Sequence, residues 1–352
     1  MTDKSKNLNW LDALRTFALL GVIIIHVSSP LVNMTYGKNM SFWWMGNVVD
    51  SAVRFAVPLF LMLSGATLLG KEYNLGEFYK RRFSRVLVPF LFWIVVYLMY
   101  RWAMLPLEVQ PHNVSGFWEG AKLLFLKEGV SKHFWYIYMI LFLYLFVPFL
   151  GKGLRKLNRS AISNLLLLWV VIVFVCKSVP LNMYSWSGEY TSKLLGYCLY
   201  SGYLVLGYYL TKLPVYSTKI RIFAPAIFIF SMLVSAVSTY LFSQQMHKLD
   251  LSMYGYLSIN TIIQSIAVFM WMKDLNFKNN YLNQIFETIS NYSYGIYLVH
   301  VLVIDIFFQY GVFWTMAHPL LSLPLLTIMV LVCSFGIIVV LRKIPGGKYV
   351  AG

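Results

Sequence analysis

An arginine and a histidine in the first long apolar segment are the residues whose types and spacing point most clearly to chemistry. Arg15 and His26 are eleven residues apart. On an α-helix, eleven residues exceed three turns by only about 20°, so both side chains lie on one face, roughly 16 Å apart along the axis. Ionisable side chains deep in a bilayer are costly and mark binding sites or transfer pathways. The pair therefore predicts a functional site inside a membrane.

Each of these two residues also has a structural interpretation. Arg15 can extend to the cytoplasmic membrane surface while paired with Asp12, one turn earlier. His26 can form a structural hydrogen bond with a neighbouring helix. Only apolar residues precede His26 for two turns, and this favours a functional role for the imidazole.

A cluster of cations forms the second candidate group. Four of the six residues from 80 to 85 are basic, namely Lys80, Arg81, Arg82 and Arg85. At a membrane surface such a cluster usually sets the topology or contacts anionic lipids, and spacing alone favours this interpretation. The functional interpretation is phosphate recognition, because a guanidinium group offers paired donors to a phosphate. A nucleotide-bearing cofactor such as coenzyme A needs this kind of phosphate-binding site.

Two further groups are expected near the opposite membrane surface. Arg54 can contact an anion or a sugar, or extend to the interface, while Gly65 in the same span permits close helix packing. His133, Trp135 and Tyr136 lie where a long external loop, about residues 106–133, re-enters the membrane. Their rings can stack on a sugar or form an interfacial aromatic belt.

The ninth apolar block holds the last group. Ser293 and His300 are seven residues apart and share a helix face, with Tyr297 within one turn of both. His300 also begins a His-x4-Asp pattern that ends at Asp305. Five helical steps turn Asp305 about 140° away from His300, so we discount an acid–base pair of these two residues.

The composition indicates an integral membrane protein. Of the 352 residues, 59% are hydrophobic and only 12% are charged, whereas soluble domains carry about 25% charged residues. The net charge of +16 comes from short basic loops between apolar blocks, which indicates membrane topology and argues against a nucleic-acid partner. There is no phosphate-binding glycine loop, metal-ligand spacing or disulfide framework, so we expect neither a metal nor a bound cofactor.

Apolar blocks of about twenty residues predict an all-α integral membrane protein with about ten transmembrane helices. Of the 29 Lys and Arg residues, 20 fall on the side that holds both termini, which places both termini in the cytoplasm. A multi-pass protein of the cytoplasmic (inner) cell membrane is therefore expected, with the first span as an uncleaved anchor. The predicted spans lie near 11–31, 47–70, 86–105, 134–151, 161–180, 194–211, 222–242, 254–272, 288–310 and 319–341.

Taken in chain order, these segments resemble the acyltransferase-3 family of membrane acyltransferases, in its short form. The resemblance covers essentially the whole chain and implies one transmembrane acyltransferase-3 domain over residues 8–342, with short cytoplasmic tails at 1–7 and 343–352. Five motifs carry it, in the order of the family: Leu11-Asp-x-Leu-Arg-x10-His26, Val57-Pro-Leu-Phe-x3-Ser-Gly65, Arg82-x2-Arg-x3-Pro89, His133-x-Trp-Tyr136 and Ser293-Tyr-Gly-Ile-Tyr-Leu-Val-His300.

The resemblance implies transfer of an acetyl or similar short acyl group from cytoplasmic acetyl-CoA, or another acyl-CoA, to a hydroxyl of a cell-surface polysaccharide or its lipid-linked precursor. Arg15 and His26 match the essential pair of the family. Arg82 and Arg85, with Arg81 beside them, match its donor-associated basic motif. Acyl transfer needs a base and stabilisation of an oxyanion. We assign the base to His26; both a transient acyl-histidine and direct transfer fit this assignment.

The other candidates have supporting roles in this scheme. His133 or His300 would orient the acceptor or assist proton transfer, and Tyr297 or Ser293 would donate to the oxyanion. Trp135, Tyr136 and Arg54 would contact the sugar. Proteins of polysaccharide synthesis are candidate partners.

Two other classes compete with this prediction. An exporter of polysaccharide or lipid-linked sugar could use the same aromatic and cationic lining, but Asp305 is the only clear acid within the predicted membrane region, which disfavours ion-coupled transport. A membrane-bound O-acyltransferase that acts on lipid or protein also uses a buried histidine, but that family usually has more spans and lacks the Arg-x10-His spacing.

Overall fold

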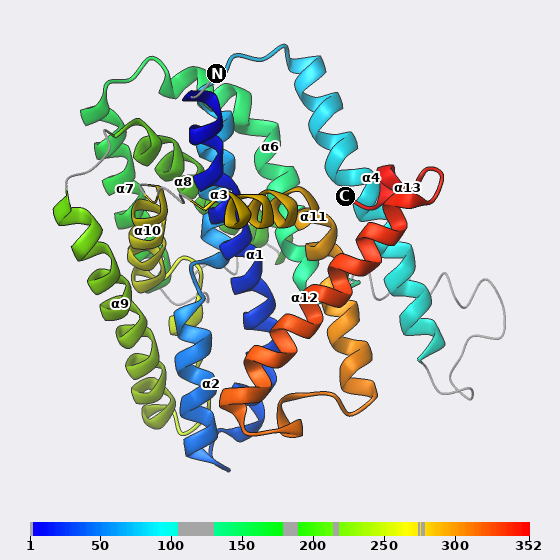
Figure 1. Cartoon of the computed structure of the whole chain (residues 1–352). Coiled ribbons are helices and arrows are strands. Elements are labelled where there is room, and N and C mark those ends of the chain that lie inside the picture. The colour runs from blue at the N-terminus through cyan, green and yellow to red at the C-terminus, as the bar shows by residue number, and fades with distance from the viewer. Residues whose placement is uncertain (1–2, 105–129, 179–188, 214–217, 274, 276–278) are drawn as a thin grey trace.

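The computed structural model describes residues 3–104, 130–178, 189–213, 218–273, 275 and 279–352, and these ranges form a bundle of helices without a β-strand (Figure 1). The predicted external loop, 106–133, lies largely outside them. In the first half of the chain the helices are α1 (Asp3–Thr35), α2 (Met40–Ala52), α3 (Ala56–Leu68), α4 (Leu75–Ala103), η1 (Lys132–Phe134), α6 (Trp135–Leu154) and α7 (Arg159–Ser178). In the second half they are α8 (Glu189–Lys212), α9 (Thr218–Gln245), η3 (Ser252–Tyr254), α10 (Ile259–Lys273), α11 (Asn280–Gln309), η4 (Trp314–Met316), α12 (Pro319–Lys343) and α13 (Gly347–Val350).

The described ranges contain nine segments that are long and apolar enough to cross a membrane. They overlap nine of the ten predicted spans. The remaining prediction, 194–211, corresponds to α8, a helix whose six tyrosines lower its hydropathy. The prediction of an all-α membrane protein is therefore confirmed, and α8 is a further long helix beside the nine.

The second predicted span, 47–70, is not one continuous helix. The helical region begins at Met40, before the predicted start, and is broken at residues 53–55 into α2 and α3. Pro58 explains the break, because it has no N–H to donate to the carbonyl of residue 54 and its ring clashes with that carbonyl in a continuous helix. In the first turn of a new helix a proline is tolerated. The break leaves Arg54 between two helix ends.

Helix α1 is central to the bundle, because it contacts α2, α3, α10, α11 and α12. Its buried residues belong to both large cores, Ala13 and Leu14 to one and Leu19 and Ile23 to the other. Lipid tails are as apolar as these side chains, so close van der Waals packing, more than the hydrophobic effect, holds the helix in place. The position of α1 fixes where Arg15 and His26 lie.

Two glycines allow α3 and α8 to approach each other closely. A side chain at Gly65 would meet the backbone carbonyl of Leu204, and one at Gly207 would meet the backbone carbonyl of Met62. Small residues at such contacts are typical of membrane helix pairs. The predicted packing role of Gly65 is confirmed.

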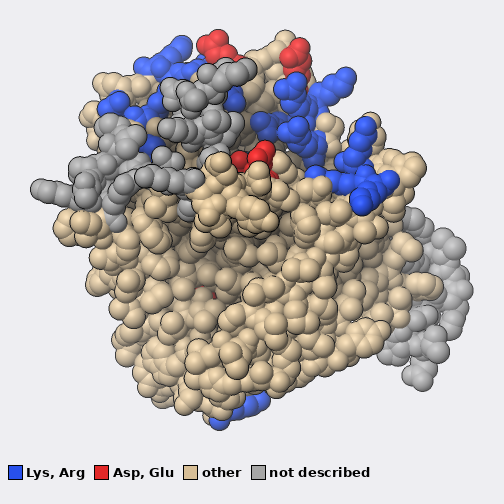
Figure 2. Space-filling model, viewed as in Figure 1, with Lys and Arg blue, Asp and Glu red and all other residues tan. Residues whose placement is uncertain are grey.

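Basic residues gather at one end of the bundle (Figure 2). This is the end where α1 and α4 begin (Figure 1), and Lys80 and Lys156 are exposed there. At the opposite end, Lys38 between α1 and α2 and Lys248 after α9 are exposed. The fold thus gathers Lys and Arg at one end of the bundle, as the sequence pattern predicts.

We predict that the basic end faces the cytoplasm, because cytoplasmic loops retain Lys and Arg. In a variant whose three native cysteines are replaced by alanine, Lys38→Cys should react with a membrane-impermeant maleimide on intact cells. Lys80→Cys should react only after permeabilisation. Labelling of Lys80→Cys from outside intact cells would reverse the assigned orientation.

Candidate active site

The face of α1 that carries Arg15 and His26 packs against α11. The Nη1 atom of Arg15 donates to the Ser290 hydroxyl at 2.8 Å, and the His26 ring lies 5.2 Å, centre to centre, from the His300 ring. Both partners are on α11. The prediction that Arg15 and His26 share one helix face is confirmed.

Three histidines from three separate segments meet at the His26 end of this face, inside the bundle. The ring of His133, in η1, lies 6.2 Å from that of His26 and 5.2 Å from that of His300. His133 and His300 are buried, whereas His26 is partly accessible. One partly accessible imidazole, that of His26, therefore packs against two buried ones.

The two buried histidines are fixed through their Nδ1 atoms. His133 Nδ1 is 2.8 Å from the Ser131 hydroxyl, and His300 Nδ1 is 2.6 Å from the Tyr297 carbonyl. A carbonyl only accepts, so Nδ1 of His300 carries the proton and Nε2 of the neutral ring keeps its lone pair. Neither Nε2 atom has a hydrogen-bond partner within the described part of the chain. Both are free to take part in proton transfer.

A tyrosine hydroxyl holds α11 in shape around His300. The Tyr97 hydroxyl, from α4, donates to the Leu298 carbonyl at 3.0 Å and accepts from the Leu302 N–H at 2.9 Å. These two groups would otherwise bond to each other within the helix, and a side chain inserted there bends a helix. Helix α11 changes direction along its length (Figure 1). The two partners of Tyr97 lie on either side of His300 in the chain, so Tyr97 fixes the helical turn that carries His300.

A second tyrosine ties η1 to α11. The Tyr297 hydroxyl donates to the His133 carbonyl at 2.5 Å, and its ring lies 5.4 Å from the ring of His133. On its other side Tyr297 contacts Tyr136, with ring centres 5.7 Å apart. Arg15 lies within electrostatic range of Tyr136. Tyr297 and Tyr136 therefore extend the aromatic contacts of the histidine cluster.

Arg15 belongs to a small polar network at the end of the α1–α11 contact that lies nearer the basic end of the bundle. Its Nη1 atom is 3.7 Å from the Asp12 carboxylate, and the Ser290 hydroxyl donates to the same carboxylate at 2.6 Å. The predicted pairing of Arg15 with Asp12 is thus present. The Arg15 side chain nevertheless keeps 35% of its surface exposed, enough to meet a ligand.

Arg54 does not extend to the membrane interface, contrary to one of the two interpretations of the sequence. It is buried at the break between α2 and α3, paired with Asp50, and its guanidinium carbon lies 4.0 Å from the ring centre of Tyr254. The break explains this inward position, because it ends α2 within the bundle. Arg54 is also within electrostatic range of His26.

Other predicted site residues have different surroundings. Ser293 donates its hydroxyl to the Ser290 carbonyl of its own helix at 2.7 Å. Trp135 stacks on Tyr256, with ring centres 5.7 Å apart and planes at 19°. Asp305 is exposed while His300 is buried, in agreement with the discounted pairing.

The predicted donor-binding arginines lie in the first turns of α4. Arg81 and Arg85 are exposed and Arg82 is half-buried. No carboxylate in the described ranges pairs with any of the three. Burial raises the pKa of the Tyr73 phenol, and the charges of Arg82 and Arg155 oppose that rise. Arg81, Arg82 and Arg85 therefore form a basic patch on α4 without an ion-pair partner in the described ranges, whereas the nearby Arg155 is paired with the exposed Glu72.

The sequence analysis missed four residues of this arrangement: Asp50, Tyr97, Ser131 and Ser290. The spacing of Asp50 and Arg54, four apart, is a signal for an ion pair that was overlooked. Asp50 is a second acid within the predicted membrane region, and it is buried whereas Asp305 is exposed. The role of Tyr97 left no local signal, because its partners are about 200 residues away in the chain.

The fold and this geometry define a multi-pass membrane protein with histidines gathered inside its bundle. The sequence model of the acyltransferase-3 family, described as an acyltransferase domain, matches residues 8–341. The chain therefore belongs to the acyltransferase-3 family and is a membrane acyltransferase. No curated protein and no solved structure matches it.

The buried pair of Asp50 and Arg54 generates a stability prediction. Asp50→Asn leaves the guanidinium without its counter-charge, and removing one partner of a buried pair costs about 3–5 kcal/mol. The double variant Asp50→Asn/Arg54→Gln should regain most of this loss, and Glu72→Gln, at an exposed acid, should change little. Thermal unfolding of the purified proteins in detergent measures the effect. Equal destabilisation in the single and double variants would contradict mutual compensation of the two charges.

Proposed function

We propose that this acyltransferase moves an acetyl or similar short acyl group from cytoplasmic acyl-CoA to a hydroxyl of a cell-surface polysaccharide or its lipid-linked precursor, in the cytoplasmic (inner) membrane. Membership of the acyltransferase-3 family supplies the reaction class. The unneutralised arginines at the start of α4 support a phosphate-bearing donor. The partly accessible ring of His26 supports a reacting hydroxyl inside the bundle.

The observation that carries the proposal is the freedom of the His26 ring. No hydrogen bond holds this imidazole within the described part of the chain, although His133 and His300 beside it are each fixed through Nδ1. A structural histidine inside a membrane would be bonded to a neighbouring helix. His26 is instead packed against other rings with its nitrogens available, as a base requires.

In the proposed reaction His26 removes the proton of the acceptor hydroxyl. The hydroxyl oxygen attacks the thioester carbonyl, the carbon–sulfur bond breaks, and the proton passes from His26 to the departing thiolate. His300 stands 5.2 Å away, centre to centre, where its unpaired Nε2 can orient the acceptor or relay the proton. Arg15, about 16 Å along the helix, would hold the donor on the basic side.

Replacement of His26 tests this assignment. His26→Gln keeps a polar side chain but cannot take up a proton at neutral pH, and loss of a general base lowers rates by about 10²–10⁴-fold. We expect surface polysaccharide from cells expressing this variant to lose its acyl groups while the polysaccharide itself is still exported. His318→Gln, at an exposed histidine, is the matched control. Near-normal acylation with His26→Gln would remove His26 from the chemistry.

Replacement of the α4 arginines tests donor binding. Arg82→Ala and Arg85→Ala should each weaken acyl-CoA binding by about 1–3 kcal/mol, or roughly 5- to 150-fold, for each charged hydrogen bond lost. The control is Lys343→Ala, which removes an exposed cation at the end of α12. Calorimetric titration of the purified proteins with acetyl-CoA measures the change. Wild-type affinity in both arginine variants would leave these residues with a topological role only.

A further inference from the structure

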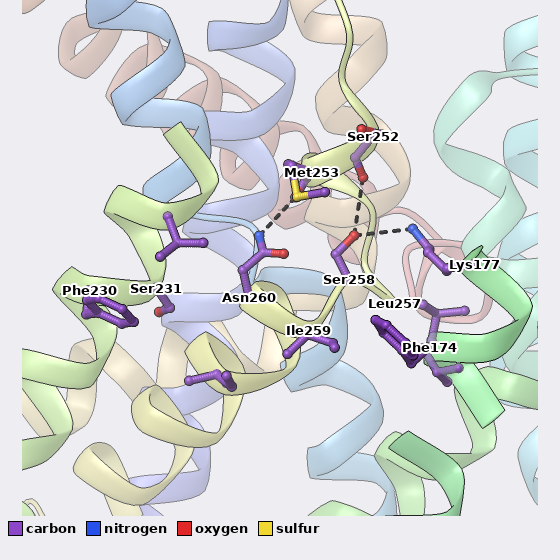
Figure 3. Close-up of a pocket in the computed structure, with 13 residues that line it drawn as sticks. Phe174, Lys177, Phe230, Ser231, Ser252, Met253, Leu257, Ser258, Ile259 and Asn260 are labelled. Atoms are coloured by element: carbon purple, nitrogen blue, oxygen red, sulfur yellow. Dashed lines mark hydrogen bonds between the residues drawn. The ribbon is translucent and has the colours of Figure 1, made fainter. Parts of the chain in front are cut away.

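A cavity opens between α7, α9, η3 and the start of α10. Its volume is about 480 Å³, which is within the range of sites that take small molecules, roughly 300–1,000 Å³. Most of its lining is apolar, and Lys177, Ser252 and Ser258 lie close together in one part of it (Figure 3). The cavity therefore has an amphipathic lining.

The polar part of the cavity contains a cation at the end of a membrane-spanning segment. Lys177, in the last turn of α7, reaches over Gly255 and donates to the Ser258 hydroxyl at 3.2 Å. No carboxylate in the described ranges forms an ion pair with Lys177. Lys177 is exposed and ends the apolar segment of α7, where a basic side chain can meet an anionic lipid head group. The cavity thus offers its one lining cation to an anion from outside the protein.

The apolar part of the cavity is open to the bilayer. Phe174 of α7 is 56% exposed and Phe230 of α9 is 67% exposed, and both line the cavity. In Figure 3 they lie on either side of Ile259, and Phe174 is on the helix that carries Lys177. A molecule that enters between these two rings from the bilayer would keep an alkyl chain against them while its polar end reaches Lys177.

We propose that this cavity is a binding site for an anionic phospholipid, with the phosphate at Lys177 and Ser258 and an acyl chain between Phe174 and Phe230. Charge complementarity selects a negative head group, because Lys177 has a hydroxyl beside it and no acid of the described residues pairs with it. The lateral opening selects a lipid over a soluble anion. The proposal is independent of the proposed reaction, since none of the cavity-lining residues belongs to the histidine cluster or to the α4 basic patch.

Photo-crosslinking in vesicles tests the site. The full chain is reconstituted in phosphatidylcholine vesicles that contain a trace of either phosphatidylglycerol or phosphatidylcholine with the same photoreactive acyl chain. Labelled peptides from α7 and α9 should be more abundant with phosphatidylglycerol by about fivefold, as expected for about 1 kcal/mol per basic residue near an anionic lipid. Lys177→Gln should remove this preference and Lys177→Arg should keep it. Lys248→Gln, at an exposed lysine on the same side of the bundle, should not alter it.

Two results would overturn the proposal. Equal labelling by the two lipids in the wild-type chain would show a non-specific lipid contact. Loss of the phosphatidylglycerol preference on addition of inorganic phosphate would show a site for a soluble anion. Retention of the preference in Lys177→Arg would show that substitution at this position does not by itself disrupt the site. The loss in Lys177→Gln would then be due to the missing positive charge.

Discussion

The contact between α1 and α11 is the interaction on which the candidate site depends. At one end it places Arg15 and Asp12 against Ser290, and further along it places His26 against His300. Because α1 is a continuous helix from Arg15 to His26, the spacing of these two side chains is set by helix geometry. A slip of either helix by one residue would rotate these side chains by about 100° and separate both sets of partners.

The irregular parts of the backbone lie where this contact needs support. Helix α3 begins after the break at residues 53–55. The side chains of Arg54 and Asp50, which are buried at this break, neutralise each other's charge. In lipid, non-helical backbone is tolerated only where it is buried in protein, and Arg54 is buried. The Tyr97 hydroxyl similarly takes up the carbonyl and N–H groups of α11 on either side of His300.

Much of the fold could be predicted from the sequence, because each span must satisfy its own backbone inside the bilayer. Length and apolar composition therefore identify helices without knowledge of their neighbours, and nine of the predicted spans coincide with long apolar helices. Local geometry also put Arg15 and His26 on one face and turned Asp305 away from His300. The motifs further predicted the acyltransferase-3 family, which the match over residues 8–341 confirms.

Only the tertiary structure decided which residues meet. The segments that carry His26, His133 and His300 are more than 100 residues apart in the chain, so no periodicity within one helix relates their rings. Packing likewise buried Arg54, a candidate interfacial residue, within the bundle, because the environment of a side chain depends on the helices around it. The sequence by itself determined the helices and the chemical groups that they carry. The arrangement of those helices determined which groups form a site.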